Sequence, residues 1–298
     1  MRSAGSATIT LRPRGPYRLA QSAWGDAGGT RSSSHGVLRV ALRPGGAPAW
    51  AIVRQRHDGD LEARVFGPAP LDEAVAALRW SLAVDDDLEG FRRMAAGDGL
   101  LGPLVEARPG YRPVRLGTLA HAVLAAMAGQ LVTSREAAQT ERAIIRRASP
   151  VHGGLRLPPS AAEIGRLSVA GLRAAGLSSG RSATLARVVG SGDPERLRRV
   201  SSPALLSWAR AERGLGPWSA GVIAIYGLGR HDLGMVGDLG LVRLLSVRLG
   251  RPASVAETAT LLSRYGEWAG LASVHLLFHP DARERRRAPR APMAYSRR

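Results

Sequence analysis

The stretch RGLGPWSA (213–220) determines the architecture that we expect for the carboxyl-terminal part of this 298-residue chain. Its G-x-G pair followed by proline predicts a tight turn leading directly into a helix, because Pro217 lacks the N–H that would have no partner in a first helical turn. Backbone N–H groups left unpaired at such a turn point outward and can receive a phosphate. Many turns between helices contain two glycines, so this stretch alone is a weak signal of function.

One acidic residue, Asp238, follows this turn and its apolar helix in the run VGDLGLVR (236–243). Aspartate is a favoured N-cap, because its carboxylate accepts hydrogen bonds from the first free amides of a helix. The helix dipole also keeps such a carboxylate ionised. Asp238 is therefore both a candidate cap and a candidate catalytic group.

The charge of the chain favours a polyanionic partner. The formal net charge is +18, and all 42 basic residues are arginine. Positive charge attracts nucleic acid through the release of condensed counterions. A basic protein that is merely soluble, or one that docks on anionic membrane, is the alternative. Without a basic amphipathic helix or a lipidation motif, we favour nucleic acid over membrane.

Composition excludes several other classes. The chain has no cysteine, which excludes disulfides, thiolate zinc sites and iron–sulfur clusters. His275 and His279 are spaced i, i+4 without an evident third ligand, so no side-chain metal site is expected. No apolar run is long enough to span a bilayer, and residues 1–10 lack a signal sequence. We expect a cytoplasmic protein of bacterial type, associated with the nucleoid.

The fold class that we predict is an α+β amino-terminal domain followed by an all-α region. Alternating apolar residues around Ile9 and at 38–42, 49–56 and 61–66 predict antiparallel strands, and 71–82 predicts a helix on the sheet. Helical patterns then continue, and Ser160 with Glu163 forms a capping box. The predicted boundaries are a disordered tail 1–8, an α+β domain 9–83, a helical region 84–280 and a basic tail 281–298.

These features in this order resemble the helix-hairpin-helix (HhH-GPD) DNA glycosylase superfamily. The shared pattern is the hairpin 213–220, an apolar helix, and Asp238 at the start of the next helix. The run MAGQLVT (127–133) resembles a turn of the DNA-3-methyladenine glycosylase II (AlkA-type) branch, which also has a sheet domain before its helices. The resemblance covers roughly residues 7 to 280.

The resemblance implies a monofunctional DNA glycosylase of base excision repair. It would act as a monomer on double-stranded DNA with a damaged base, flip the nucleotide out and excise alkylated, 3-methyladenine-like purines by hydrolysis. Asp238 would be the catalytic carboxylate. The implied DNA-binding residues are Gly214, Leu215, Gly216, Arg213, Gln130, Leu131 and Arg243. The implied base-pocket residues are Trp218, Trp268, Leu239 and Val222.

Two of these implied roles have ordinary structural alternatives. Leu131 would be an apolar wedge that fills the gap left by the flipped nucleotide, or else a core leucine at a helix end. Trp218 and Trp268 would stack on a cationic base, or else they are core aromatics. The resemblance also implies a monovalent cation, Na⁺ or K⁺, on hairpin carbonyls near Arg210, Glu212 and Leu215, and no other cofactor.

The chemistry needs few groups. An alkylated purine is cationic and already a good leaving group, so one carboxylate suffices, unlike the carboxylate pair of ordinary glycosidases. Bifunctional relatives use a lysine where this chain has Trp218, and the chain contains no lysine, which excludes a lysine Schiff base and the strand cleavage that follows from it. Val222 and Leu239 stand where other members of the branch have tyrosines, so the pocket is less aromatic.

Two other functions remain open from the sequence. The chain could bind DNA lesions without catalysis, although such a protein has no need of a carboxylate near phosphates. It could also be a glycosylase for oxidised or deaminated bases. The basic tail 281–298 is either a solvated tail or an additional grip on DNA.

Overall fold

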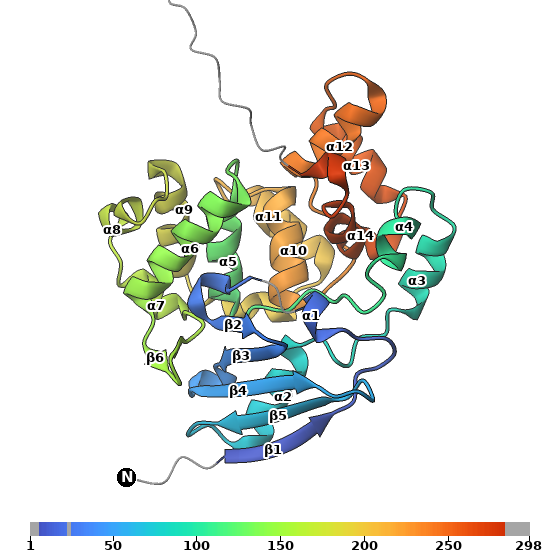
Figure 1. Cartoon of the computed structure of the whole chain (residues 1–298). Coiled ribbons are helices and arrows are strands. Elements are labelled where there is room, and N and C mark those ends of the chain that lie inside the picture. The colour runs from blue at the N-terminus through green and yellow to red at the C-terminus, as the bar shows by residue number, and fades with distance from the viewer. Residues whose placement is uncertain (1–5, 23–24, 284–298) are drawn as a thin grey trace, which may run out of the picture.

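A computed structural model of the chain describes residues 6–22 and 25–283. An antiparallel five-stranded sheet forms one end of the molecule, and the helices stack above it (Figure 1). The strand order is β1-β5-β4-β3-β2. The strands are β1 (Ser6–Leu11), β2 (Arg31–Ser34), β3 (Val37–Leu42), β4 (Ala49–Gln55) and β5 (Leu61–Phe66).

Alternation along the strands places one face of the sheet against a helix. In β4 and β5, Ala51, Val53 and Leu61 are completely buried, while the residues between them are more exposed. The helix α2 (Leu71–Ser81) covers this face and contributes the buried Leu78. The prediction of an antiparallel sheet with one helix is therefore confirmed.

The rest of the chain is mostly helical, as predicted. Its helices are α3 (Glu89–Ala96), α4 (Gly102–Glu106), α5 (Leu119–Gly129), α6 (Ser134–Ala148), α7 (Ala161–Gly165), α8 (Val169–Ala174), α9 (Ser179–Gly190), α10 (Ser202–Ala211), α11 (Pro217–Val222), α12 (Leu239–Leu249), α13 (Val255–Ser263) and α14 (Ala269–Leu276). Short 3₁₀ segments occupy Pro194–Arg199, Gly266–Trp268 and Pro280–Ala282. Before β2 the chain forms α1 (Leu19–Ser22) and the 3₁₀ segment Ala27–Gly29, and after β3 it forms the 3₁₀ segment Pro44–Gly46. The capping box of Ser160 and Glu163 opens α7 as expected.

The main helical core surrounds α5. Nine of its eleven residues are buried, because this alanine-rich helix has packing partners on every side. The helix α11 continues directly into a π-helix, Ile223–Leu228. A Cβ atom on Gly227 would lie 2.6 Å from the Cβ of Ala122, so this glycine lets the π-helix lie directly against α5. Helices α10 and α11 are thereby fixed beside the centre of the molecule.

The two predicted tail boundaries are wrong in detail, and the predicted helical region contains a short β-hairpin. Strand β1 begins at Ser6, inside the expected tail 1–8, because Ser6 already pairs with Phe66 of β5. The expected all-helical region contains a small hairpin, β6 (Val151–His152) with β7 (Leu155–Arg156). Gly153 and Gly154 form its turn with φ of 57° and 76°, as two-residue hairpins require.

At the other end, residues 281–283 of the expected basic tail belong to the folded body. Ala282 closes the 3₁₀ segment Pro280–Ala282, and its carbonyl accepts a hydrogen bond from Arg243 Nη1 at 2.8 Å. Residues 1–5 and 284–298, the remainder of both expected tails, lie outside the described residues. None of the helices in the described ranges has the length and apolar character needed to cross a membrane.

Several polar contacts join the sheet domain to the helices. Arg43 donates to both carboxylate oxygens of Glu163 at 2.9 Å, and this pair is almost buried. Arg115, in the connector before α5, donates to Asp86 at 2.6 Å. Removing one member of such a pair would leave a buried charge without its partner, so these contacts specify how the two parts dock.

The buried His275 of α14 makes stability dependent on pH. It packs against Phe91 and Tyr111, and burial lowers the pKa of its imidazole to about 4, with Arg108 acting in the same direction. The unfolded chain binds this proton below about pH 6.5 and the folded chain does not. The contribution of His275 to stability is therefore fully present above pH 6.5. As the pH falls toward 4, up to about 3 kcal/mol of the free energy of unfolding is lost.

We expect His275→Gln to flatten this pH dependence. The measurement is the free energy of unfolding in denaturant at several pH values between 4 and 7. His57→Gln, at an exposed histidine in the β4–β5 turn, is the control and should leave the slope unchanged. An unaltered slope in His275→Gln would show that other groups control acid stability.

Candidate active site

The stretch 213–220 forms the predicted turn between two helices. Helix α10 ends at Ala211 and α11 begins at Pro217. Gly214 has φ of +91°, and a Cβ atom there would lie 2.3 Å from Thr184 Oγ1, so only glycine fits. Gly216 is extended, and the space around its Cα is open. Among the described residues no acceptor contacts the N–H of Gly214 or Gly216, so both amides are available to a ligand such as phosphate.

Several carbonyls of this turn accept hydrogen bonds. Glu212 O accepts from Leu215 N at 3.0 Å, and Arg213 O accepts from Thr184 Oγ1 at 3.1 Å. Gly214 O accepts from Gln130 Nε2 at 2.8 Å. The bonds from Thr184 and Gln130 join the turn to α9 and to the end of α5. The amide of Leu215, which was expected to bind phosphate, is instead used within the turn.

Asp238 opens α12 and is held at both carboxylate oxygens. Oδ1 accepts from Gly240 N at 2.8 Å, which makes Asp238 the N-cap of the helix. Oδ2 accepts from the indole Nε1 of Trp218, also at 2.8 Å. The preceding residue, Gly237, has φ of +83° and donates its N–H to the buried Thr258 Oγ1. The carboxylate that caps α12 is thus also the candidate catalytic group. Each of its oxygens keeps a lone pair that can accept a hydrogen bond from a further partner.

Two glycines let Trp218 and Asp238 approach one another. A Cβ on Gly129, the last residue of α5, would lie 2.9 Å from Trp218 Cη2, so the indole packs directly against the end of that helix. A Cβ on Gly221 of α11 would lie 2.6 Å from the carbonyl oxygen of Gly234. The loop that carries Asp238 therefore runs against α11, one turn beyond Trp218.

Leu131 lies immediately after α5 in a conformation that is rare for its type. Its φ is +54° and its side chain is 85% exposed. The left-handed region costs a residue with a Cβ about 1–2 kcal/mol, and an exposed leucine regains little by packing. Leu131 is thus not the core leucine of the alternative interpretation. An apolar side chain held outward at this cost suits a role outside the protein.

Gln130 was expected to bind DNA, but in the structure its side-chain amide bonds within the protein. Its amide Nε2 donates to Gly214 O and to Ser219 Oγ at 3.2 Å, so the side chain joins the turn after α5 to the hairpin. Its two N–H groups serve this internal link. A contact of Gln130 with DNA would use Oε1.

The other expected pocket residues are dispersed. Leu239 follows Asp238 and is 46% exposed at the start of α12. Val222 is 6% exposed and belongs to the main helical core, so it does not present a surface at the site. Trp268 packs against Phe91 and stacks on His231, each ring pair 5.8 Å apart, and no contact among the described residues joins it to Asp238.

The two arginines expected to bind DNA are differently placed. Arg213 is exposed beside Gly214, where a phosphate on the hairpin would be within its reach. Arg243 is half-buried and donates to Ala282 O, so at least part of its guanidinium holds the carboxyl-terminal segment. Among the described residues no group of His, Asp and Glu side chains forms a metal site.

Tyr226, on the π-helix, is a residue near the site that sequence reasoning missed. Burial raises the pKa of its phenol to about 12; the charge of Arg31 opposes this shift and that of Asp238 adds to it. Tyr226 is therefore a neutral phenol within electrostatic range of the carboxylate. A π-helical turn often marks a functional site, but the sequence IAIYGL (223–228) reads as ordinary apolar helix.

The chain is similar in sequence and in fold to known proteins. No family model matches the chain. A curated relative from Mycobacterium tuberculosis (strain CDC 1551 / Oshkosh), a probable bifunctional transcriptional activator/DNA repair enzyme AlkA, is 31% identical over 221 residues. The match covers 70% of this chain and 43% of the relative, so the chain spans less than half of that protein's length.

Solved structures share the fold. The 3-methyladenine DNA-glycosylase from Archaeoglobus fulgidus superposes with a TM-score of 0.78 at 19% identity, over 90% of this chain and 96% of that one. The Clostridium acetobutylicum 8-oxoguanine glycosylase/lyase in complex with double-stranded DNA gives a TM-score of 0.73 at 14% identity, over 92% and 96% of the two chains.

The fold, the hairpin and the sequence similarity together place the chain in the helix-hairpin-helix DNA glycosylase superfamily. Within this superfamily it is related to the AlkA-type branch, as the turn at 127–133 and the sheet domain indicated.

Substitutions at Asp238 should separate its structural role from its chemical one. Asp238→Asn keeps an oxygen for Gly240 N–H or Trp218 Nε1–H, and we expect its unfolding free energy to stay within about 0.5 kcal/mol of the native value. Asp238→Ala removes the cap and should cost about 1–2 kcal/mol. Urea denaturation of both variants measures the difference, and equal losses would show that the cap contributes nothing.

Proposed function

We propose that the chain is a monofunctional DNA glycosylase that flips alkylated, 3-methyladenine-like purines out of double-stranded DNA and excises them by hydrolysis, with Asp238 as the catalytic carboxylate. The observation that carries the proposal is the Trp218–Asp238 hydrogen bond, which joins the hairpin to the start of α12, together with the exposed Leu131 after α5. A protein that only binds DNA gains nothing from a carboxylate fixed close to phosphate-binding amides, because that charge repels the backbone.

Each part of the site has a task in such a reaction. The free amides of Gly214 and Gly216 bind a backbone phosphate and so set the position of the strand. Leu131 enters the duplex where the nucleotide leaves, which offsets the few kcal/mol that unstacking costs. The indole N–H of Trp218 orients the carboxylate.

Cleavage of the glycosidic bond then requires little more than a negative charge that stabilises the sugar. An alkylated purine carries a positive charge and leaves as a neutral base, while positive charge develops on the sugar. The ionised Asp238 stabilises this oxocarbenium-like sugar, or orients the water that attacks it. The purine takes the electron pair of the glycosidic bond and leaves as a neutral base. Water supplies the hydroxyl of the abasic sugar and gives up its other proton to the solvent.

The similar proteins support this assignment. The relative from M. tuberculosis is described as a DNA repair enzyme AlkA, and the A. fulgidus structure as a 3-methyladenine DNA-glycosylase. The C. acetobutylicum neighbour is a glycosylase/lyase, but its chemistry does not transfer by fold. The present chain contains no lysine, so it cannot form the lysine imine of a lyase, and borohydride should trap no lysine-linked DNA.

A monovalent cation on the carbonyls of Arg210, Glu212 and Leu215 is part of the same proposal. Backbone carbonyl oxygens are the donors that Na⁺ and K⁺ favour. Glu212 O accepts from Leu215 N at 3.0 Å and keeps a second lone pair for such an ion. Replacing K⁺ with tetramethylammonium at constant ionic strength should weaken DNA binding.

The decisive experiment is base release from methylated duplex DNA by the native chain and by Asp238→Asn. We expect the variant to lose activity by on the order of 10²–10³-fold while binding DNA normally, because only the transition-state charge loses its counterpart. Oxidised and deaminated duplexes are tested in parallel. Tight binding without release from any lesion would leave a lesion-binding protein, and release of oxidised or deaminated bases alone would change the substrate class.

A second experiment addresses Leu131. We expect Leu131→Ala to lower base release from a paired lesion about tenfold or more, and to affect binding to single-stranded or abasic DNA much less, because a wedge acts only where a stack must be opened. Leu131→Met, which keeps an apolar side chain of similar volume, is the matched control. Equal losses on all these substrates would contradict the wedge role.

A further inference from the structure

The turn that carries Leu131 cannot hold its shape by its own packing. Helix α5 ends at Gly129, and the carbonyls of its last turn have no partners within the helix. Leu131 adds a left-handed backbone conformation and an 85% exposed side chain. A conformation of this kind persists only where its surroundings fix it.

Arg181, in the first turn of α9, supplies such a support. Its Nη1 lies 3.4 Å from the carbonyl oxygen of Met127 and 3.3 Å from those of Ala128 and Gln130. These distances are long because one nitrogen serves three acceptors. A positive charge at the end of a helix is also attracted by the helix dipole. The Arg181 guanidinium is itself held, because its Nε donates to Ser178 Oγ at 3.2 Å.

The same helix contacts the hairpin. Thr184, three residues after Arg181, donates to Arg213 O, and Arg187, three residues later again, donates its Nε to Glu212 Oε1 at 2.6 Å. Residues spaced in this way share one face of a helix. One face of α9 therefore contacts both the turn of Leu131 and the hairpin, and Gln130 closes the link from the other side through Gly214 O.

We propose that Arg181 is a positioning residue, which fixes the turn of Leu131 at a set distance from the hairpin so that Leu131 enters the duplex beside the bound phosphate. Arg181 acts through Leu131 and does not touch the reacting atoms. This inference rests on the proposed function, since it assigns Arg181 to the insertion step of that reaction.

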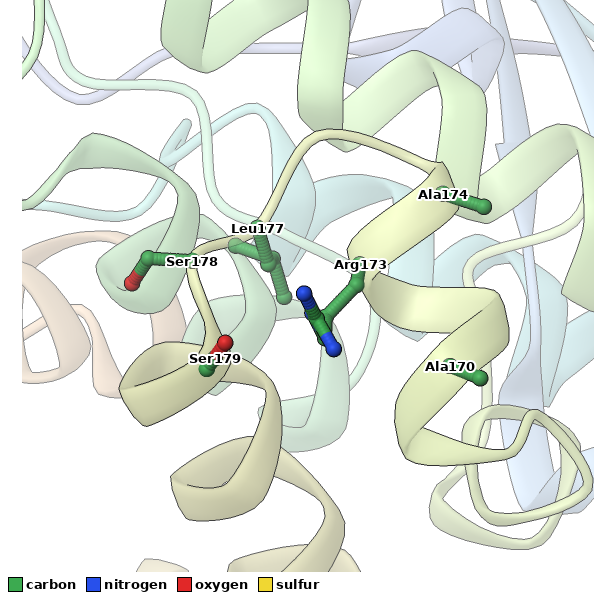
Figure 2. Close-up of a pocket in the computed structure, with 6 residues that line it drawn as sticks. All are labelled: Ala170, Arg173, Ala174, Leu177, Ser178 and Ser179. Carbon is green, nitrogen blue, oxygen red and sulfur yellow. The ribbon is translucent and has the colours of Figure 1, made fainter.

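A plain phosphate contact is the competing role for any arginine on this surface. Arg173, at the end of α8, provides the comparison, because it lies across the α8–α9 turn from Ser178 and lines an open hollow of about 560 Å³ (Figure 2). The backbone carbonyl of Arg173 accepts from Gly176 N at 2.9 Å, but its guanidinium makes no hydrogen bond or ion pair among the described residues. A loss of charge alone should have the same effect at either arginine.

The test is a double-mutant cycle with Arg181→Met, Leu131→Ala and the double variant, measured by single-turnover base release from a paired lesion. We expect Arg181→Met to lower the rate on the order of tenfold, and to change it less than about twofold when Leu131 is already alanine, because residues that act together are not additive. Arg173→Met should leave the duplex rate near native. Additive losses, or equal effects of Arg173→Met and Arg181→Met, would overturn the proposal.

A second readout needs no base release and so separates this inference from the proposed function. The fluorescence of a 2-aminopurine beside an abasic-site analogue increases when the neighbouring base stack is opened. We expect the native chain and Arg173→Met to produce this signal. Leu131→Ala and Arg181→Met should lose it. A native chain that gives the signal but releases no base would sink the enzymatic function and leave the positioning role standing. Arg181→Lys, which keeps the charge with a different reach, should recover part of the signal. If Arg181→Met is too unstable to assay, Arg181→Lys takes its place in the double-mutant cycle and must still show non-additivity with Leu131→Ala.

Discussion

The hydrogen bond between Trp218 Nε1 and Asp238 Oδ2 is the contact on which the arrangement of the site depends. It joins the first turn of α11, and with it the hairpin, to the first turn of α12. The bond forms only because the chain can bring the two segments together: Gly129 leaves room for the indole, and Gly221 lets the loop before Asp238 lie against α11. A larger side chain at either glycine would move the hairpin relative to the carboxylate.

Around this pair, the functional elements are held by backbone groups more than by side-chain packing. Asp238 caps its own helix, Gln130 bonds to a hairpin carbonyl, and Arg181 gathers the carbonyls at the end of α5. Backbone atoms are the most rigid points that a protein offers, so contacts to them transmit position well. This would matter for the base-flipping reaction proposed above, in which a displacement of about 1 Å between the proposed wedge, the phosphate contact and the carboxylate is enough to cost activity.

The sheet domain stabilises this arrangement from outside. It docks through the nearly buried Arg43–Glu163 pair and through Arg39, which donates to the carbonyl of Gly153 in the β6–β7 hairpin. Within the sheet, Trp50 of β4 stacks on Phe66 of β5 with ring centroids 4.1 Å apart. The charge of Arg31, at the start of β2, opposes the rise in the pKa of Tyr226, so the sheet domain also influences the electrostatics beside the site.

The sequence by itself determined the local features of this protein: the antiparallel sheet from alternation, the helix boundaries from caps, and the hairpin and Asp238 from glycine, proline and aspartate at characteristic spacings. Each strand, helix and turn depends on neighbours within a few residues, whereas the pairing of β1 with β5 joins residues up to 60 positions apart. The resemblance to the superfamily implied roles for residues far apart in the chain, yet it could not show that Val222 is buried in the core or that Trp268 packs against Phe91 and His231. Only the tertiary structure decided that Leu131 is exposed, that Gln130 bonds to the hairpin and that Arg181 bonds to the turn of Leu131. The two hydrogen-bonded contacts join residues about 50 to 90 positions apart, and no periodicity or local motif records such a pairing.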